Sequence, residues 1–333
     1  MSSEESAGTS RSGFLKRAAG ATIAVAGAGV GAAAFAERAA AATPLTGGDF
    51  VPAHRFSIEI DGVNCGVLGG VDGGASDYDV VLDALGPDHI VHKHLGQPKY
   101  EDFSIQVGSG MSKPMYDWIK ASFDKGGAAV SGAIVSMGDS NEEIARREFS
   151  QALVTSVTFP ALDSIAGRKG NFTVTFSAPS VSDGTPSGKP VDALKQKAWL
   201  CSNFKIKIDG LSTSRVSKIE SFTIKQKVVQ DSAGVSRNVV GVGDLSVTFP
   251  PAGLASWQQW YDNIGVDPTD ERCGTLVVTG APGGAVLSLG LSNLGLYQLK
   301  SETDNVAGQA IKRFNAELYC EELQFTYSGG WAA

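Results

Sequence analysis

Residues 56–62 read FSIEIDG, and residues 204–210 read FKIKIDG. The two stretches begin 148 residues apart. In each, Phe, Ile and Ile alternate with polar residues, which is the period of a strand buried on one face. The Asp-Gly pair that follows predicts a turn, because both residues tolerate positive φ. A strand and turn written twice predict that the chain holds two copies of one fold.

A second set of matches lies downstream at a shorter spacing. Residues 101–105 (EDFSI) align with residues 243–247 (GDLSV), and Trp118 aligns with Trp260, in both cases 142 residues apart. The change of spacing is six residues, which a single shortened hairpin in the second copy would explain. We therefore expect a tandem duplication of one domain.

Length and composition favour two β-rich domains. The 333 residues include 41 glycines, and Val, Ile, Thr and Ser are abundant, as in strands and turns. We expect domains at residues 50–180 and 201–330, joined by a linker at 181–200 that is rich in Ser, Gly and Pro. Each domain is predicted to be mainly β, an antiparallel barrel or sandwich. One short helix flanks each, at 114–123 and 256–264.

Long hairpins are expected in both copies. In the first, an apolar run at 78–82 precedes residues 83–98, whose Gly, Pro, Asp and His predict a long loop, and a strand follows at 100–107. In the second, residues 219–229 and 239–249 are predicted to pair as a long hairpin.

Residues 1–43 differ in composition from the rest of the chain. An uncharged Ala/Gly/Val run at 18–36 ends in small residues, as in a signal peptide. The preceding SRSGFLK at 10–16 resembles the twin-arginine motif S-R-R-x-F-L-K, with Ser12 at the position of the second arginine. A low-complexity arm and a retained membrane anchor remain as alternatives. The protein is exported or extracellular if the signal is used, and otherwise part of a cytoplasmic particle or virion.

The net charge of −7 argues against nucleic-acid binding, which needs a concentrated basic surface. The four cysteines lack CxxC spacing, so we expect ordinary small buried thiols, with disulfides only after export. Sequence does not choose among the three possible pairings of these cysteines, which are Cys65, Cys201, Cys273 and Cys320.

One histidine cluster is metal-like in composition. His92 and His94 would share a face of a strand, with His89 close by in sequence, but no carboxylate or thiolate converges on them. A polar interface loop is the favoured interpretation. No G-x-S-x-G or H-E-x-x-H motif is present, so we expect no enzyme activity and no cofactor.

The run HLGQPKYEDFSIQVG at 94–108 resembles the tail-tube family of contractile phages and injection systems, which is related to haemolysin-coregulated secretion tube proteins. Members carry Pro-Gly-x-x-Lys-Tyr-x-x-(Ile/Val)-Thr-Leu and then a Leu-x-x-Trp helix, and here YDWI at 116–119 supplies the helix. The matching residues in the run are Lys99, Tyr100, Phe103 and Ile105. Gly-Gln-Pro replaces the usual Pro-Gly order, and the second copy has lost Lys-Tyr, reading VGD at 242–244.

The resemblance implies a two-sheet β-barrel flanked by a helix, with six barrels in a ring and rings stacked into a hollow tube. Because each chain is expected to hold two copies, three chains would form one pseudo-hexameric ring. The implied role is structural, with the chain itself and possibly sheath and baseplate proteins as partners. The expected assembly contacts are made by His92, His94, Lys99, Tyr100, Phe103 and Arg237.

Two alternatives remain open on the sequence. The chain could be a tube initiator or adaptor at the baseplate or terminator end, because unequal repeats offer two different faces. A different class of function, a secreted β-rich glycan-binding protein or hydrolase, would use the signal-like start.

Overall fold

The computed structural model describes residues 55–83, 90–108, 111–123, 129–192, 199–230, 236–280, 284–306 and 309–327. The first half of the chain contains β1 (Arg55–Ile60), β2 (Val63–Leu68), β3 (Gly70–Asp72), β4 (Ser76–Asp83), β5 (His92–Tyr100), β6 (Phe103–Gly108), α2 (Lys113–Phe123), β7 (Val130–Met137), β8 (Glu143–Phe159), β9 (Leu162–Asp163), β10 (Asn171–Ser177) and β11 (Ser180–Gly184). The second half contains β12 (Trp199–Ile208), β13 (Lys218–Ile219), β14 (Phe222–Gln230), β15 (Ser236–Val242), β16 (Leu245–Phe249), the 3₁₀ turn η1 (Pro251–Gly253), α3 (Leu254–Ile264), β17 (Arg272–Gly280), β18 (Ala285–Val306) and β19 (Gln309–Tyr327).

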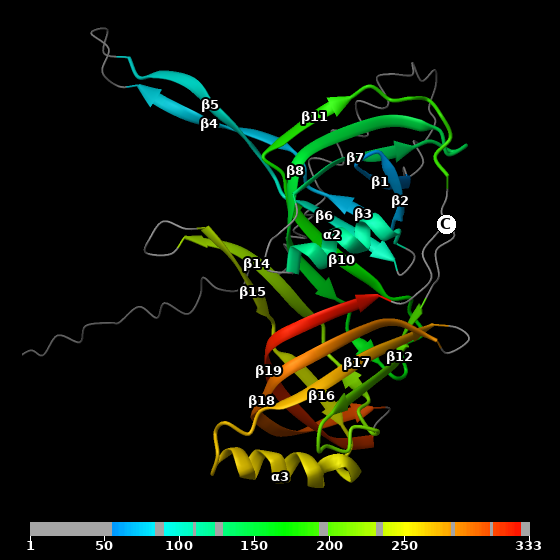
Figure 1. Cartoon of the computed structure of the whole chain (residues 1–333), viewed down its shortest axis with the longest axis vertical. Coiled ribbons are helices and arrows are strands. Elements are labelled where there is room, and N and C mark those ends of the chain that lie inside the picture. The colour runs from blue at the N-terminus through cyan, green and yellow to red at the C-terminus, as the bar shows by residue number, and fades with distance from the viewer. Residues whose placement is uncertain are drawn as a thin grey trace, which may run out of the picture.

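The predicted fold class is confirmed, because every named strand pairing is antiparallel and one helix flanks each half. The two halves lie one above the other along the long axis of the molecule, with α3 at the far end of the second half (Figure 1). Their main sheets run in the same order. In the first half the order is β1-β7-β8-β10-β6-β3, and in the second half it is β12-β17-β18-β19-β16-β13.

The register of the strands also repeats. Ile60 pairs with Gly132 where β1 meets β7, and Ile208 pairs with Gly274 where β12 meets β17. The Ile positions are 148 residues apart and the Gly positions 142 apart, which are the two spacings found in the sequence. The spacings therefore correspond to equivalent places in the two sheets.

Backbone hydrogen bonds outside the ladders follow the same spacings. The N–H of Glu101 donates to the carbonyl of Ala75 at 2.9 Å, and the N–H of Gly243 donates to the carbonyl of Thr223 at 2.9 Å. These bonds fix the root of the hairpin that lies between β3 and β6 in the first half and between β13 and β16 in the second half. Two non-glycine residues with positive φ, Gln151 and Asn293, are also 142 residues apart.

The helices close one side of each half with buried tryptophans. Trp118 of α2 meets the ring of Phe176 edge-on, with centroids 5.2 Å apart. Trp257 of α3 stacks on Phe249 at 4.8 Å, and Trp260 lies beside it, fully buried. The helical spacing of aromatic and aliphatic residues read from the sequence thus marks the face that packs on the sheet.

Two segments differ from the sequence expectation. Part of residues 83–98, predicted as a loop, is strand β5, and β5 pairs with β4 as a separate two-stranded sheet. Residues 181–184 of the predicted linker belong to strand β11, which pairs with β8. Both segments are rich in turn-forming residues, and in both a neighbouring strand supplies the backbone partners that outweigh local propensity. Residues 1–43, the signal-like segment, lie outside the described residues.

Gly132 offers a direct test of the repeated register. A Cβ at this position would lie 2.1 Å from the carbonyl oxygen of Glu59, and one at Gly274 would lie 2.7 Å from that of Lys207. We expect Gly132→Ala to lower the free energy of unfolding by about 1–3 kcal/mol, because the two strands must separate. Gly274→Ala should act in the same direction and less strongly. Denaturant unfolding of the full chain measures both.

Gly167→Ala is the matched control, since nothing lies within 4 Å of a Cβ at Gly167. It should change the free energy of unfolding by less than about 0.5 kcal/mol. Equal unfolding midpoints for the Gly132 and Gly167 variants would show that the β1–β7 register is not as described.

Candidate assembly interface

The two halves are joined by a strand of the second half that extends a sheet of the first. Strand β14 pairs antiparallel with the end of β8, over four residue pairs from Phe222↔Phe159 to Lys225↔Ser156. The hydroxyl oxygens of Thr158 and Thr223 lie 2.9 Å apart across this ladder. The hairpin β14–β15 thereby belongs to the ten-stranded sheet of the first half, although its residues follow β12 and β13 in the chain.

Aromatic side chains bury this junction. The rings of Phe159 and Phe222 stack with centroids 4.8 Å apart and planes 10° from parallel. On the other side of the junction, Tyr116 of α2 contacts Phe325 and Tyr327 of β19, with centroids 5.4 and 5.7 Å apart. The two halves consequently share one continuous hydrophobic core.

A second contact between the halves lies next to the β14–β8 ladder, three residues from the Phe222↔Phe159 pair on both segments. Strand β9 pairs with β13, which places Leu162 opposite Ile219 in the sheet of the second half. The ring of Trp199, at the start of β12, packs against Phe172 and lies over Gly170, where a Cβ would be 2.1 Å from the ring. The exchange of strands in both directions makes the junction rigid.

The equivalent hairpin of the first half, β4–β5, projects away from the body of the molecule (Figure 1). It forms a two-stranded sheet in which β4 pairs with β5. Tyr78, Val80 and Leu82 alternate along β4, and Val80 pairs with Leu95 of β5, so these side chains share one face. All four are exposed large hydrophobic residues. The hairpin therefore presents an apolar face that the first half leaves in solvent.

The root of this hairpin is fixed to the body. Gly73 and Gly74 both have positive φ, and a Cβ at Gly74 would lie 2.2 Å from the ring of Phe103. Arg147 of β8 donates from Nη2 to the carbonyl of Gly74 at 2.9 Å and forms an ion pair with Asp183 of β11 at 2.6 Å. The hairpin is thus held at a defined direction although its strands lie outside the main sheets.

The structure places four of the expected interface residues on β5. His92 and His94 pair with Asp83 and Val81, on the face opposite the exposed apolar one. Lys99 is exposed and forms an ion pair with Asp79 at 2.6 Å. The hydrogen bond and the charge of Asp79 raise the pKa of Lys99 above its ordinary value.

Tyr100, Phe103 and Arg237 fall in three different environments. Tyr100 is half-buried and packs against the core at the hairpin root. Phe103 is buried and stacks on Phe176 at 4.9 Å, so it stabilises the first half rather than offering a surface. The backbone of Arg237 lies in β15, opposite Val229, and its side chain is outside the described part of the structure.

Sequence reasoning missed the residues that carry the junction itself. Thr158 and Thr223 carry no chemical motif, and neither does the alternation at Tyr78, Val80 and Leu82. The signal that could have found them is the spacing of 148, which aligns residues 74–82 with residues 222–230.

The described residues contain no group of three or more His, Cys, Asp or Glu that could hold a metal ion. His89, the third member of the histidine cluster, lies outside them. No helix in the described part of the chain is long and apolar enough to cross a membrane.

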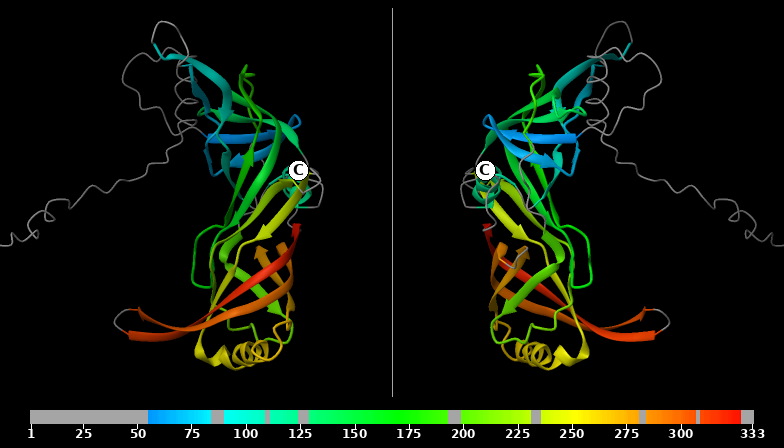
Figure 2. Two further views of the ribbon diagram at one scale, coloured as in Figure 1. Left: turned by 90° about the vertical axis from the view of Figure 1, so that its left-hand side faces the viewer. Right: turned by 90° about the vertical axis from the view of Figure 1, so that its right-hand side faces the viewer.

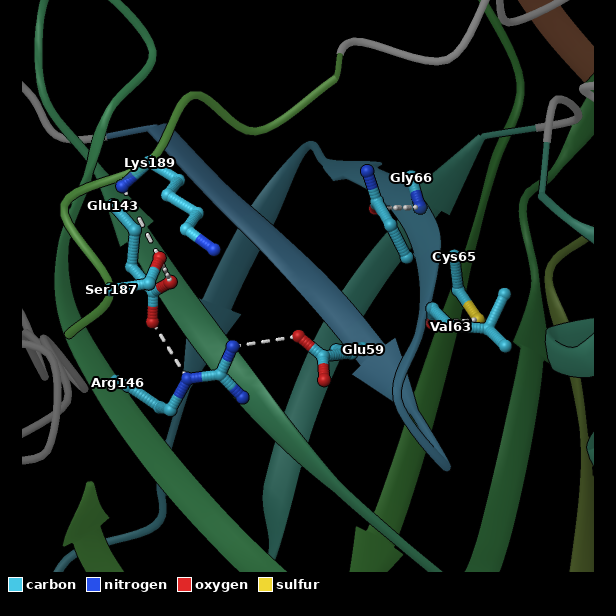
Figure 3. Close-up of polar contacts among 9 residues, drawn as sticks. Glu59, Val63, Cys65, Gly66, Glu143, Arg146, Ser187 and Lys189 are labelled. Carbon is cyan, nitrogen blue, oxygen red and sulfur yellow. Dashed lines mark hydrogen bonds and ion pairs between the residues drawn. The ribbon is translucent and has the colours of Figure 1, made fainter. Parts of the chain in front are cut away.

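The four cysteines are free thiols in this structure, three of them buried and Cys273 exposed. Cys65 donates to the carbonyl of Val63 at 3.3 Å (Figure 3), and burial raises its pKa. Burial likewise raises the pKa of Cys320 to about 11. Neither thiol is activated toward nucleophilic chemistry, which requires a lowered pKa.

One half-buried ion network lies at the start of β8 (Figure 3). Arg146 donates from Nε to Glu143 at 2.6 Å and from Nη2 to Glu59 of β1 at 2.7 Å. The hydroxyl of Ser187 donates to the second oxygen of Glu143 and accepts the N–H of Lys189 at 3.3 Å. The network ties β1, β8 and the segment after β11 together.

The charges in this network are mutually satisfied. Burial acts to raise the pKa of Glu143, but the hydrogen bonds from Arg146 and Ser187 and the charge of Arg146 outweigh it, so the pKa is lowered. The two carboxylates in turn raise the pKa of Arg146. A carboxylate held ionised in this way is a poor general acid, so the arrangement serves to hold strands together.

Residues 52–178 match a family model described as the T4-like virus tail tube protein gp19. The matched segment corresponds to the first half of the chain, and the match confirms the predicted resemblance to tail-tube proteins there. It supports a structural role related to a tail tube. A search among curated proteins found no match.

Three solved structures are similar to parts of this chain. The anti-feeding prophage cap, which terminates the AFP tube, has 20% identity and a TM-score of 0.37, over 43% of this chain and 97% of the cap chain. A chain of the PVC sheath–tube complex, from an extracellular contractile injection system, has 21% identity and a TM-score of 0.36, over 41% and 92%. A chain of the PVC sheath/tube terminator has 20% identity and a TM-score of 0.36, over 42% and 100%.

The Glu143 network predicts a pH-dependent contribution to stability. Because the pKa of Glu143 is lowered on folding, its contribution is full above the ordinary glutamate value of 4.5 and is lost as pH falls through the folded value. Glu143→Gln keeps the side-chain size and removes the charge. We expect it to lower the free energy of unfolding at pH 7 by about 1–3 kcal/mol. That difference should shrink steadily below about pH 5, as urea unfolding at several pH values would measure.

Asp117→Asn is the control, because Asp117 forms an exposed ion pair with Lys113 one helical turn away. Such a pair contributes less than about 0.5 kcal/mol. A Glu143→Gln effect that stays constant from pH 7 to pH 3 would contradict the ion-network assignment.

Proposed function

We propose that this chain is a structural subunit of the tube of a phage-tail-like particle or contractile injection system. The tail-tube family match over residues 52–178 supports this role for the first half. The repeated sheet order and register of the second half support a tandem duplication of the same domain. The observation that carries the proposal is the junction itself, in which a hairpin of one domain completes the sheet of the next.

The subunit count follows from this duplication. A ring of six equivalent barrels needs three chains when each chain supplies two, so the proposed unit is a trimeric pseudo-hexamer. The contact between domains inside one chain then serves as the pattern for the contact between chains. Rings of this kind would stack into a hollow conduit, in which the chain contributes shape and rigidity and no chemical step. Sheath and baseplate proteins are the partners that such a tube would require.

A role at one end of a tube, as initiator, adaptor or terminator, is the second candidate. The two halves present different surfaces, which favours it. The hairpin formed by the distal parts of β18 and β19 projects sideways from the second half (Figure 2), whereas β8 and β10 are connected by the short strand β9. A ring built from unequal halves alternates these surfaces around its axis. In a uniform stack, each ring would have to dock on a neighbouring ring whose surfaces alternate in the same way.

The remaining alternative, a secreted β-rich glycan-binding protein or hydrolase, rests on residues 1–43. Amino-terminal sequencing of the native protein separates a cleaved signal from a retained arm. A first residue near Thr43 means cleavage, and a first residue near Ser2 means retention.

Assembly is tested directly on the purified full-length chain. Native mass spectrometry should give a trimer as the smallest assembled species, and negative-stain class averages should show rings with threefold modulation of six lobes. A tube subunit would add stacked rings at higher concentration, whereas an end adaptor would stop at one or two rings. Strict sixfold averages containing six chains would overturn the count of three. A monodisperse monomer at every concentration, particularly one that binds glycans, would overturn the structural role.

A further inference from the structure

We propose that β4 of one chain, with Ala75 directly before it, adds to the edge of β18 in a second copy of this chain, so that Ala75 lies opposite Lys300 and Asp77 opposite Gln298. This inference rests on the proposed ring and specifies the surfaces that would close it. The donor is the projecting hairpin β4–β5 of the first half. The acceptor is the distal part of β18 in the second half of the neighbour.

The register is taken from the junction inside the chain. There, Thr223 of β14 lies opposite Thr158 of β8, and Lys225 lies opposite Ser156. Positions equivalent to those of β14 lie 148 residues earlier in the first half, and positions equivalent to those of β8 lie 142 residues later in the second half. These spacings also hold for the hairpins, because Asp77 pairs with Lys99 as Lys225 pairs with Gly241.

The acceptor edge is open in the described part of the chain. Over residues 298–301, β18 pairs with β19 on one side. The equivalent residues of β8 pair with β10 on one side and with β14 on the other. No described strand takes the place of β14 beside β18, and the pairing of β17 with β18 ends at Leu294. An open edge presents backbone donors and acceptors that a further strand can satisfy.

Equivalent positions differ in burial as the proposal requires. Val157 and Ile224, which meet at the internal junction, are each 1% exposed. Their counterparts are Leu299, which is half-buried, and Ser76, which is exposed. The same positions are thus covered where a hairpin has docked and uncovered where none has.

The chemistry of the donor fits the acceptor. Tyr78 is equivalent to Gln226, which is 7% exposed in the docked hairpin, whereas Tyr78 is 46% exposed. Further along the same face of β4–β5, Val80, Leu82 and Leu95 are 58%, 62% and 65% exposed.

The other face of β4 carries Asp77, Asp79 and Asp83 together with Val81, and Lys99 of β5 lies opposite Asp77. In the proposed ladder Asp77 lies diagonal to Lys300. A predominantly apolar face on one side and a mostly charged face on the other would set which side of the hairpin turns toward the neighbour.

A second copy is the occupant that the structure favours. In the described part of the chain, hairpin β4–β5 is equivalent to the docked hairpin β14–β15, and residues 298–301 of β18 are equivalent to the edge of β8 on which that hairpin docks. A head-to-tail contact of this kind closes into a ring when the rotations between successive copies add up to a full turn. Otherwise it continues as a filament. The internal contact, repeated between chains, would alternate first and second halves around a ring.

The test is disulfide trapping in full-length protein that carries Cys273→Ser, which removes the exposed thiol. The pair Ala75→Cys with Lys300→Cys reports the proposed contact after mild oxidation with a copper–phenanthroline oxidant. The pair Thr158→Cys with Thr223→Cys is the positive control, because these side chains already meet within one chain. The pair Ala75→Cys with Leu299→Cys is the off-register control, since adjacent strand residues face opposite sides.

We expect Ala75→Cys/Lys300→Cys to give reducible bands of two and three chains, ending at three for a closed ring. The off-register pair should give at least tenfold less product, and the positive control should give an internal bond without higher bands. Mixing the two single variants should give dimers alone, because each molecule then carries one reactive partner.

The outcomes separate this inference from the proposed function. Rings that form while the Ala75/Lys300 pair cross-links no better than its off-register control would overturn the inference and leave the tube role standing. Cross-linked chains that never form rings would support the contact and overturn the ring. Monomers without cross-links at high concentration would overturn both.

A second pair of variants tests the apolar face without introducing cysteines. Val80→Asp/Leu82→Asp places charge on the face that would dock, and Val81→Asp places it on the opposite face. We expect the double variant to lose assembly, as measured by native mass spectrometry, with an unchanged circular dichroism spectrum. Val81→Asp should assemble as the unmodified chain does. Equal assembly of the double variant and the unmodified chain would overturn the assignment of the docking face.

Discussion

The pairing of β14 with the edge of β8 is the contact on which the architecture depends. A strand edge left in water keeps its backbone groups available to any other strand, and this chain covers one such edge with its own second half. The pairing also brings Phe222 onto Phe159 and, with β19 against α2, merges two cores into one. The placement of the second half against the first and their shared core follow from it.

The same pairing uses one of two equivalent hairpins and one of two equivalent strand edges. Two equivalent hairpins and two equivalent edges exist, and one polypeptide can join one hairpin to one edge. The hairpin β4–β5 and the edge of β18 at residues 298–301 lie in opposite halves of the chain and lack the pairing that β14 and β8 make. The association proposed above would satisfy both, and backbone hydrogen bonding with alternating side-chain contacts would make it register-specific.

Local patterns predicted the core elements well, because each of them buries a periodic apolar face. The FSIEIDG strand and the helices at 114–123 and 256–264 all form where the alternation or helical spacing predicts them. Residues 92–98 were misjudged because Gly96 and Pro98 usually interrupt strands, whereas here they lie in an edge ribbon whose pairing shifts at that place. Phe103 was misjudged because a motif match carries no information on which face a strand residue occupies.

The sequence by itself determined the β-rich class, the two halves with their spacings of 148 and 142, and the resemblance of the first half to tail-tube proteins. The β-rich class follows from short-range periodicity, and the two halves and the resemblance follow from matching stretches of sequence, so none of them requires knowledge of a tertiary contact. Only the tertiary structure decided that β14 crosses to the sheet of the first half while β4–β5 stands apart. The two hairpins occupy equivalent places in their halves, and what separates them is the presence of a sheet edge within reach, which is a property of the folded chain.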